Sequence, residues 1–397
     1  MTSHEKVVES LRYGIPPEGF VSHFTVGRLS EINELTTRLH NNQAGTLLLK
    51  ANYGAGKSHL LKFIRETALK QNFVVSSVTL DAKSGIRFNR MEQILGEVLK
   101  GLEAPNQVEQ GISAFLDLIC EQARNSKIKN GLEWQKITNK NRWNTSYLLE
   151  SPAIFIALRA WYSGRSDKNV IQDWLYQRSK YPTKELFHEI VEKANVTYRD
   201  EFSWTSNLQW VSYRTKTQIF DFKSNAYSQA WSALRDIDLL ARASGLRGLI
   251  ILFDEFEDVL SNISNINHQE IAFQNLLQFF SGQQFKGMSF FAVTPEFVFK
   301  CKHRLSTRDR LDERYVHLDK IPTFEMSPLE INHLKELAQK VRVIHGLAYD
   351  WDTNTNSIEL ELNSVVERLG NIAVQNRTRQ TIKEVVKFLD NQLQEEE

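Results

Sequence analysis

Short apolar runs that do not alternate with polar residues predict the buried strands of an α/β protein. These runs occupy residues 46–50, 73–80, 249–253, 289–293 and 315–318. Continuous Val, Ile, Leu and Phe is typical of strands covered on both faces, as in a parallel sheet flanked by helices. Between the first two runs, apolar residues at helical spacing predict a crossover helix over residues 58–72. The pattern therefore predicts a core with a central parallel sheet.

A glycine-rich turn follows the first run and opens the predicted crossover helix. Its residues are Ala51, Asn52, Tyr53, Gly54, Ala55, Gly56, Lys57 and Ser58, with His59 next in the helix. This order is typical of a phosphate-binding P-loop, in which backbone N–H groups and the positive end of a helix dipole meet the phosphates. Lys57 would neutralise the β- and γ-phosphates, and the Ser58 hydroxyl would hold Mg²⁺. Ala51 stands where the usual pattern has glycine, which costs little unless that residue needs a positive φ.

Polar side chains end two of the later apolar runs. Asp254 and Glu255 follow the run at residues 249–253, and in an open parallel sheet ligands bind at the carboxyl ends of strands. We expect Asp254 to support the Mg²⁺ shell and Glu255 to orient or deprotonate an attacking water, although adjacent acids also occur as solvated turns or helix caps. Thr294 ends the next run. It would position water or sense the γ-phosphate, or else cap a helix that begins at Pro295.

Length, charge and cysteine content bound the class of protein. A chain of 397 residues suits two or three units, and a net charge of +1 argues against a generally basic surface, so any nucleic-acid contact must come from local patches. Cys120 and Cys301 are far apart and are most simply reduced thiols. The first residues lack the order of a signal peptide, and no apolar run approaches membrane-spanning length. We expect a cytoplasmic protein without a membrane contact.

The stretch from residue 105 to residue 244 carries most of the tryptophans and few prolines, which predicts a mainly helical insertion. Helices are expected around residues 153–161 and 226–240. Aromatic residues at helical spacing usually belong to a core. Basic residues surround Trp134 and Trp143, and this mixture would either bind a phosphate backbone and stack a base or form a solvated loop.

The order of strand, P-loop, acidic strand and polar strand tip resembles the AAA+ division of P-loop ATPases, in the branch similar to origin-recognition ATPases. A proline-rich turn followed by Val26, Gly27 and Arg28 looks like the AAA+ element that lines the adenine pocket, which implies that Ile15, Gly27 and Arg28 bind the nucleotide. A narrower resemblance is to the ATP-binding BrxD family of bacteriophage-exclusion (BREX) systems. It is carried by the P-loop and by residues 8–17, 245–249, 294–297 and 340–345.

The resemblance implies ATP and Mg²⁺ as ligands, bound by Tyr53, Gly54, Ala55, Gly56, Lys57, Ser58 and His59 together with the acidic pair. It also implies an AAA+ core with a large insertion and a C-terminal helical lid, for which amphipathic spacing after Pro322 provides separate support. The first half of the core is expected at residues 1–104 and the insertion at 105–244. The second half of the core is expected at 245–322 and the lid at 323–397.

Arginines at the ATP are implied as well. An AAA+ protein commonly uses an arginine finger near the fifth strand on ATP held by a neighbouring subunit, which implies a homo-oligomer; Arg310 or Arg314 is favoured, and an exposed basic or DNA-facing surface is the alternative. Arg379, before a helix expected at residues 381–393, has the position of a second sensor on the γ-phosphate. Arg377 is the alternative to Arg379, and a solvated surface arginine is a further one.

These features predict an AAA+ ATPase of a prokaryotic antiphage defence system, acting with other defence proteins such as a helicase, nuclease or methyltransferase. The first hypothesis is a DNA-associated motor or loader in a multiprotein complex, which the basic residues of the insertion favour. The alternative is a nucleotide-controlled signalling switch that recruits an effector without binding DNA, which the near-neutral charge and the lack of a winged-helix pattern after the lid favour. A scaffold with little hydrolysis is disfavoured by Glu255.

Overall fold

The computed structural model describes residues 2–81, 83–124, 149–164, 167–176, 227–370 and 376–396. Within this part of the chain, six strands form one sheet in the order β3-β2-β4-β5-β1-β6. The parallel strands are β1 (Gly45–Lys50), β2 (Val74–Thr79), β4 (Leu249–Asp254), β5 (Met288–Val293) and β6 (Thr323–Glu325). The short β3 (Leu102–Glu103) pairs antiparallel with β2 at the edge. The predicted α/β class with a mainly parallel sheet is confirmed.

The prediction of a strand at residues 315–318 is wrong. This segment lies in a 3₁₀ helix, η4 (Glu313–Lys320), and the strand that pairs with the far side of β1 is β6. Tyr315 and Leu318 are buried whereas the two residues between them are exposed, which is the three-residue repeat of a 3₁₀ helix. An aromatic residue beside a β-branched one has high strand propensity, but the tertiary contacts of this segment override it.

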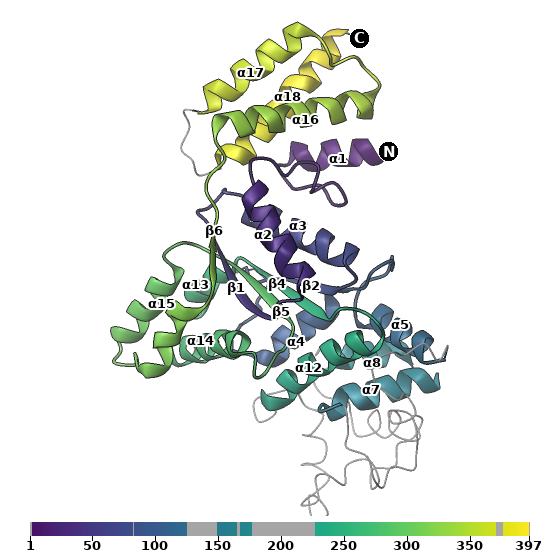
Figure 1. Ribbon diagram of the computed structural model, residues 1–397, viewed down its shortest axis with the longest axis vertical. Helices are drawn as coiled ribbons and strands as arrows, with labels where there is room; N and C mark the ends of the chain where they lie inside the picture. The colour runs from purple at the N-terminus through teal and green to yellow at the C-terminus, as the bar shows by residue number, and fades with distance from the viewer. Residues whose placement is uncertain are drawn as a thin grey trace, which may run out of the picture.

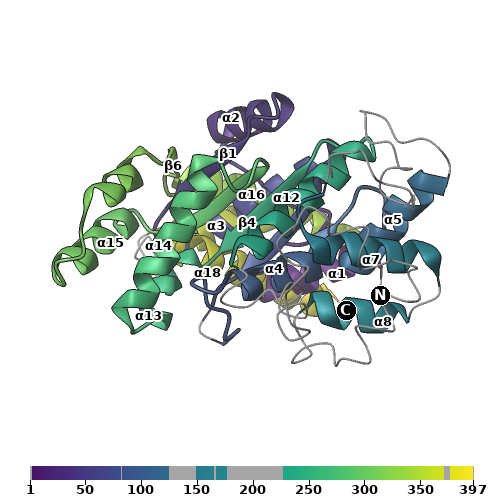
Figure 2. The same cartoon turned by 90° about the horizontal axis from the view of Figure 1, so that it is seen from below.

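Helices cover both faces of the sheet. On one face, α2 (Leu29–His40) and the crossover helix α3 (Lys57–Lys70) pack on alternate residues of the central strands. Helix α3 confirms the crossover helix predicted at residues 58–72. Figure 2 shows α2 on one side of the sheet and α4, α12 and α14 on the other. The helices of this second face are α4 (Met91–Lys100), α5 (Ile112–Arg124), α7 (Pro152–Ser163), α8 (Lys168–Leu175), α12 (Tyr227–Ala243), α13 (Val259–Asn262), α14 (Ile266–Ser281) and α15 (Phe297–Ser306).

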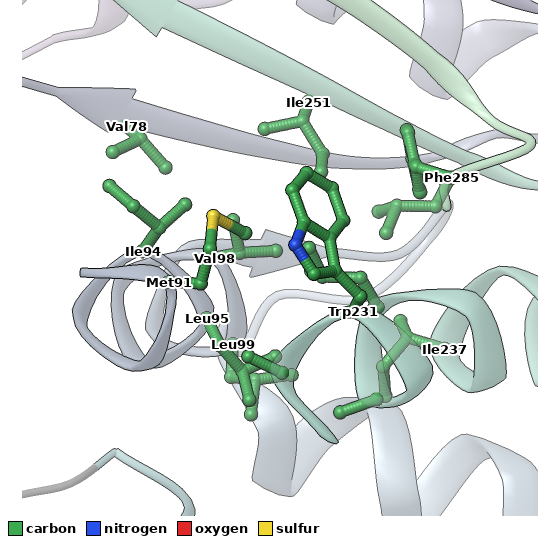
Figure 3. Packing of buried hydrophobic residues seen from close by; sticks show 14 of the residues in the cluster. Val78, Met91, Ile94, Leu95, Val98, Leu99, Trp231, Ile237, Ile251 and Phe285 are labelled. Carbon is green, nitrogen blue, oxygen red and sulfur yellow. The ribbon is translucent and has the colours of Figure 1, made fainter. Parts of the chain in front are cut away.

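Helices α7 and α12 confirm the helices predicted around residues 153–161 and 226–240. Trp161, Trp174 and Trp231 are all buried, as expected for core aromatics. Trp231 of α12 packs between the sheet and α4, beside Ile251 and Met91 (Figure 3). The other aromatic and basic residues considered for nucleic-acid contact, Trp134 and Trp143 with the lysines around them, lie outside the described residues. Both cysteines are buried free thiols, as predicted.

A second helical unit stands at one end of the sheet and joins the two ends of the chain (Figure 1). It consists of α1 (Ser3–Arg12), α16 (Ile331–Tyr349), α17 (Asn356–Gly370) and α18 (Arg377–Glu396), and we call it the helical body. One apolar cluster joins α1 and residues Phe24 and Val26 to the three C-terminal helices. The N-terminal helix therefore packs with the end of the chain and not on the sheet.

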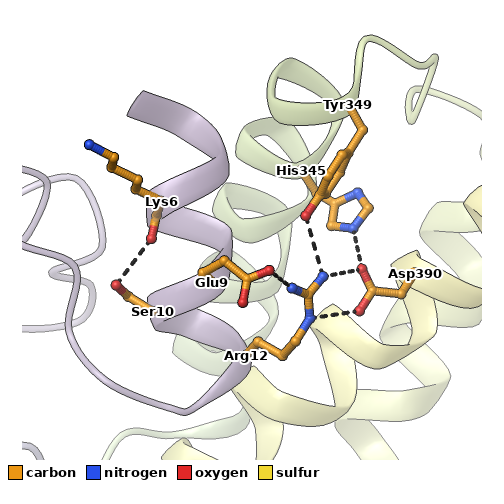
Figure 4. A network of polar contacts seen from close by, with 7 residues as sticks. All are labelled: Lys6, Glu9, Ser10, Arg12, His345, Tyr349 and Asp390. Atoms are coloured by element: carbon orange, nitrogen blue, oxygen red, sulfur yellow. Dashed lines mark hydrogen bonds and ion pairs between the residues drawn. The ribbon is translucent and has the colours of Figure 1, made fainter. Parts of the chain in front are cut away.

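A polar network connects α1 to helices α16 and α18 of the helical body (Figure 4). The guanidinium of Arg12 donates to both carboxylate oxygens of Asp390 on α18, at 2.7 and 3.1 Å, and to the Tyr349 hydroxyl at 3.3 Å. Fully buried His345 of α16 also bonds Asp390, at 3.0 Å, and accepts a hydrogen bond from the Trp351 indole N–H. Because hydrogen bonds to Arg12 and His345 favour the charged carboxylate, they lower the pKa of Asp390 against the effect of its burial.

Candidate functional site

A cavity of about 370 Å³ lies between the helical body and the carboxyl end of the sheet. Its wall has an apolar side and a polar side. Apolar side chains line the side of the helical body, among them Leu11, Phe24, Val26, Leu337 and Ile382. The opposite side is formed by the glycine-rich turn and by the acidic residues after β4. The volume is within the range of about 300–1,000 Å³ usual for small-molecule sites.

The glycine-rich turn has the backbone that its residue types predict. Gly54 and Gly56 have φ values of 75° and 97°, in the left-handed region that favours glycine, and Gly56 immediately precedes α3. Gly54 also lies so close to the backbone of Asn376, at the start of α18, that a Cβ atom would collide with it. Ala51 is buried and does not have a positive φ, so alanine at this position is tolerated. The glycine-rich turn and Asn376, the residue just before α18, both line the cavity.

Of the three residues expected from the proline-rich segment, Ile15 and Arg28 line the cavity. Arg28 is buried, and its Nη2 donates to the carbonyl of Ala55 at 2.6 Å, so it supports the backbone of the turn. Gly27 is not on the wall. Its Cα has a positive φ of 62° and is covered by the ring of His333, which would collide with a Cβ atom.

The glycine-rich turn and the acidic pair meet at the polar side of the cavity, because the parallel strands β1 and β4 have their carboxyl ends on the same side of the sheet. Lys57, Ser58, Asp254 and Glu255 all line it. Glu255 has a left-handed φ of 55°, and its N–H donates to Asp254 Oδ1 at 2.9 Å. A positive φ is uncommon for a non-glycine residue and is concentrated at functional sites. Burial, followed by the charges of Asp254 and other nearby carboxylates, raises the pKa of Glu255.

Thr294 is buried just after the end of β5, which lies between β1 and β4, and it is not on the cavity wall. The alternative that its side chain caps a helix is wrong, because α15 begins at Phe297 after Glu296 and has no side-chain cap. The carbonyl of Thr294 accepts the Phe297 N–H at 3.1 Å.

The oxygen donors present fit a hydrated divalent cation. The Ser58 hydroxyl and the Asp254 carboxylate share the cavity, and Mg²⁺ is usually held by one or two carboxylates together with waters and substrate phosphates. Among the described residues, no group of three or more His, Cys, Asp and Glu side chains has the arrangement of a protein-only metal site. A cation shared with a bound phosphate matches this donor set.

The arginines fall in different places. Arg379 lines the cavity, and its Nε donates to the carbonyl of Gly14 at 3.3 Å. Arg377 instead donates to the carbonyls of Leu329 and Gly370 and fastens the helical body internally. The predicted start of their helix at residue 381 is wrong: α18 begins at Arg377, since Asn376 with a φ of 69° makes the turn before it.

Arg310 and Arg314 do not line the cavity. Both pair with Glu270 of α14, at 2.8 and 3.4 Å, and Arg314 also pairs with Asp312. Their side chains are 41% and 59% exposed, so they remain accessible to another molecule. A role on ATP of a neighbouring subunit stays a prediction.

Several wall residues were not anticipated from the sequence. Glu257 and Asp258 belong to η3 (Phe256–Asp258), directly after Glu255, and Asn376 and Thr378 come from the start of α18. The sequence has acids at residues 254, 255, 257 and 258, but their position after a strand does not by itself predict that residue 257 faces the turn. Lys57 Nζ donates to the Ala51 carbonyl at 2.9 Å and lies 3.5 Å from a Glu257 carboxylate oxygen.

The sheet and the cavity at its edge define a mixed α/β protein whose fold is compatible with a P-loop core. The family model described as BREX system ATP-binding protein BrxC/D matches residues 2–146 and 208–397. The chain therefore belongs to this family of ATP-binding proteins of the BREX phage-defence system, which confirms the resemblance noted in the sequence. Comparisons with curated proteins and with solved structures gave no match. Each helix in the described ranges is too short or too polar to cross a bilayer.

His59 has a perturbed environment beside the glycine-rich turn. The Thr25 hydroxyl donates to the Val21 carbonyl, so the 2.9 Å contact between Thr25 Oγ1 and His59 Nε2 has the imidazole N–H as donor. Burial, with the charges of Arg28 and Lys62, lowers the pKa of His59 from 6.5 to about 4. The folded protein therefore holds a neutral imidazole over the mildly acidic range.

This arrangement predicts a loss of stability in acid. Below about pH 6.5 the unfolded chain binds a proton at residue 59 that the folded chain excludes, so the free energy of unfolding falls as pH drops toward 4, by about 3 kcal/mol from this group. Urea unfolding of nucleotide-free protein at about pH 7 and about pH 4.5 measures it. His59→Gln should show a smaller fall than wild type, and the exposed-site control His317→Gln should match wild type. Equal falls in wild type and His59→Gln would contradict the assignment.

Proposed function

We propose that this protein is an AAA+ ATPase that binds ATP·Mg²⁺ in the cavity between the helical body and the sheet and hydrolyses it by in-line attack of water. One observation carries the proposal: a single cavity brings the glycine-rich turn and the acidic pair, which are about 200 residues apart in sequence, together with Arg379 and an apolar wall. A nucleotide needs this division, because its base is largely apolar and its phosphates are anionic.

The polar wall supports assigned roles in phosphate chemistry. Lys57 would bind the β- and γ-phosphates, while Ser58 and Asp254 would hold Mg²⁺, which neutralises charge on the phosphates when bound. Glu255 would orient or deprotonate the attacking water; its raised pKa suits a general base. Thr294, after the strand between the two motifs, would act as the first sensor.

The apolar wall supports a base site and a lid. Leu11 and Ile15 come from the N-terminal segment, whereas Leu337 and Ile382 come from α16 and α18. A bound base would therefore contact the N-terminal segment and the C-terminal helices, while the phosphates contact the turn at the end of the sheet. Arg379 would serve as the second sensor. We propose that the helical body is the lid of an AAA+ protein, with α1 added to the C-terminal lid helices. The core halves at residues 1–104 and 245–322 and the insertion at 105–244 are part of the same proposal.

The nucleotide state would then be passed on through lid orientation or through a neighbouring subunit. Arg310 or Arg314 would reach ATP of a second copy in a homo-oligomer, after release from Glu270. Their exposure, and the fact that neither lines the chain's own cavity, support action in trans. Work in BREX defence implies other defence proteins as partners, of the helicase, nuclease or methyltransferase type, in the cytoplasm.

Replacing Glu255 with glutamine should separate binding from hydrolysis. The variant keeps the shape of the side chain and removes the base, so we expect the ATP hydrolysis rate to fall about 10²- to 10⁴-fold with ATP affinity kept within a few-fold. Phosphate release and equilibrium titration measure the two quantities. Glu325→Gln is the matched control, since Glu325 ends β6 at the same edge of the sheet but is exposed outside the cavity. Wild-type turnover in Glu255→Gln would sink the assignment.

DNA should distinguish the motor or loader from the signalling switch. A DNA-associated motor predicts ATP hydrolysis stimulated by single- or double-stranded DNA, and binding that weakens steeply as salt is raised. We expect stimulation in wild type and none in Glu255→Gln, with DNA binding retained in both. If DNA neither binds in a salt-dependent way nor changes the rate, the motor hypothesis is wrong and the effector-recruiting switch takes its place.

A further inference from the structure

Lys57, the proposed phosphate ligand, already has a carboxylate partner inside the cavity. Its Nζ lies 3.5 Å from Glu257 Oε1, and the two side chains are each only 8% exposed. Among the ion pairs of the described residues, this is the one that involves Lys57, and Asp258 on the same turn makes none with it. The ammonium also lies 4.9 Å from the centre of the Tyr53 ring. The cation is therefore enclosed by the site before any phosphate arrives.

The local backbone explains why residue 257 faces the glycine-rich turn. The left-handed conformation of Glu255 ends β4 and starts the 3₁₀ turn η3. Phe256 then anchors this turn: it is fully buried, with ring centroids 4.7 Å from both Phe88 and Phe291. With the ring on the second face of the sheet, the next side chain is directed back to the cavity. The placement of Glu257 follows from a fixed aromatic core and not from a free loop.

The pair is incomplete on the carboxylate side. Glu257 Oε2 is buried and has no hydrogen-bond partner among the described residues. A buried carboxylate with one unpaired oxygen is costly, so the Lys57 contact is the main interaction that offsets its burial. Burial accordingly raises the pKa of Glu257, and Lys57 acts against that rise. The unpaired oxygen makes Glu257 a poor partner in a purely structural ion pair. Its carboxylate instead suits the role of counter-ion to a lysine that later binds phosphate.

We propose that Glu257 is a positioning residue that holds Lys57 in the cavity and competes with the nucleotide phosphate for it. The inference rests on the proposed function, because it assumes that Lys57 binds phosphate. Phosphate brings negative charge to the same ammonium, and charges of like sign in a buried site repel strongly. Binding then requires Lys57 to turn from Glu257 to the phosphate. Glu257 therefore sets how tightly the phosphates are held without contacting the base.

The test compares ADP with adenosine, both without magnesium, in wild type and Glu257→Gln. Glutamine keeps the size of the side chain and removes the competing charge, so ADP should bind about tenfold more tightly to the variant. Adenosine lacks phosphate and should bind wild type and variant alike. The affinity gain for ADP should shrink as salt is raised, because it is electrostatic. A purely structural role for Glu257 would move the two ligands together.

Glu325→Gln is the matched control, since it removes a carboxylate that ends β6 and lies outside the cavity. Its ADP affinity should stay within about twofold of wild type, because the Glu325 side chain is exposed and does not line the cavity. Glu257→Asp withdraws the carboxylate by one methylene and should give a smaller gain for ADP; it serves as the test if the glutamine variant does not fold. Unchanged or weaker ADP binding in a folded Glu257 variant overturns the inference and leaves the proposed function standing. If wild type binds neither ADP nor adenosine, both fall together.

Discussion

Burial of a parallel sheet on both faces is the constraint on which the site depends. Because β1, β4 and β5 run in the same direction between two layers of helices, their carboxyl ends lie at one edge, and the residues after them are the first free to leave the core. The glycine-rich turn follows one end and the acidic residues follow another. Strand order alone therefore brings together the glycine-rich turn and the acidic residues, which are about 200 residues apart in sequence.

The second determinant of the site is the packing of the N-terminal helix α1 against the C-terminal helices. Helix α1 contributes Val7, Val8 and Leu11 to the same apolar cluster as α16 and α18, and Arg12 adds charge-assisted hydrogen bonds to Asp390. The chain passes from this body to the sheet after α1 and returns to it before α16 (Figure 1). Residues of both passages line the cavity. A ligand that contacts both walls is therefore coupled to the orientation of the whole helical body.

Much of this could be predicted from sequence because it follows local rules. Gly54, Gly56 and Lys57 have fixed offsets set by backbone conformation, and Asp254 ends an apolar strand. What could not be predicted depends on tertiary contacts. Segment 315–318 has strand propensity but forms η4, because tertiary contacts that bury Tyr315 and Leu318 override that propensity. Glu257 reaches Lys57 only because Phe256 is locked in an aromatic core, and the sequence does not show that contact.

The central claim is that one nucleotide contacts both the sheet and the helical body, and amide hydrogen exchange with and without ATP tests it most directly. Three separate segments should gain protection together: residues 14–28, the glycine-rich turn at residues 51–59, and the first turns of α18 from Arg377. Helix α17, none of whose residues lines the cavity, should change little and provides the internal reference. Protection confined to the glycine-rich turn, with residues 14–28 and the start of α18 unchanged, would contradict the account.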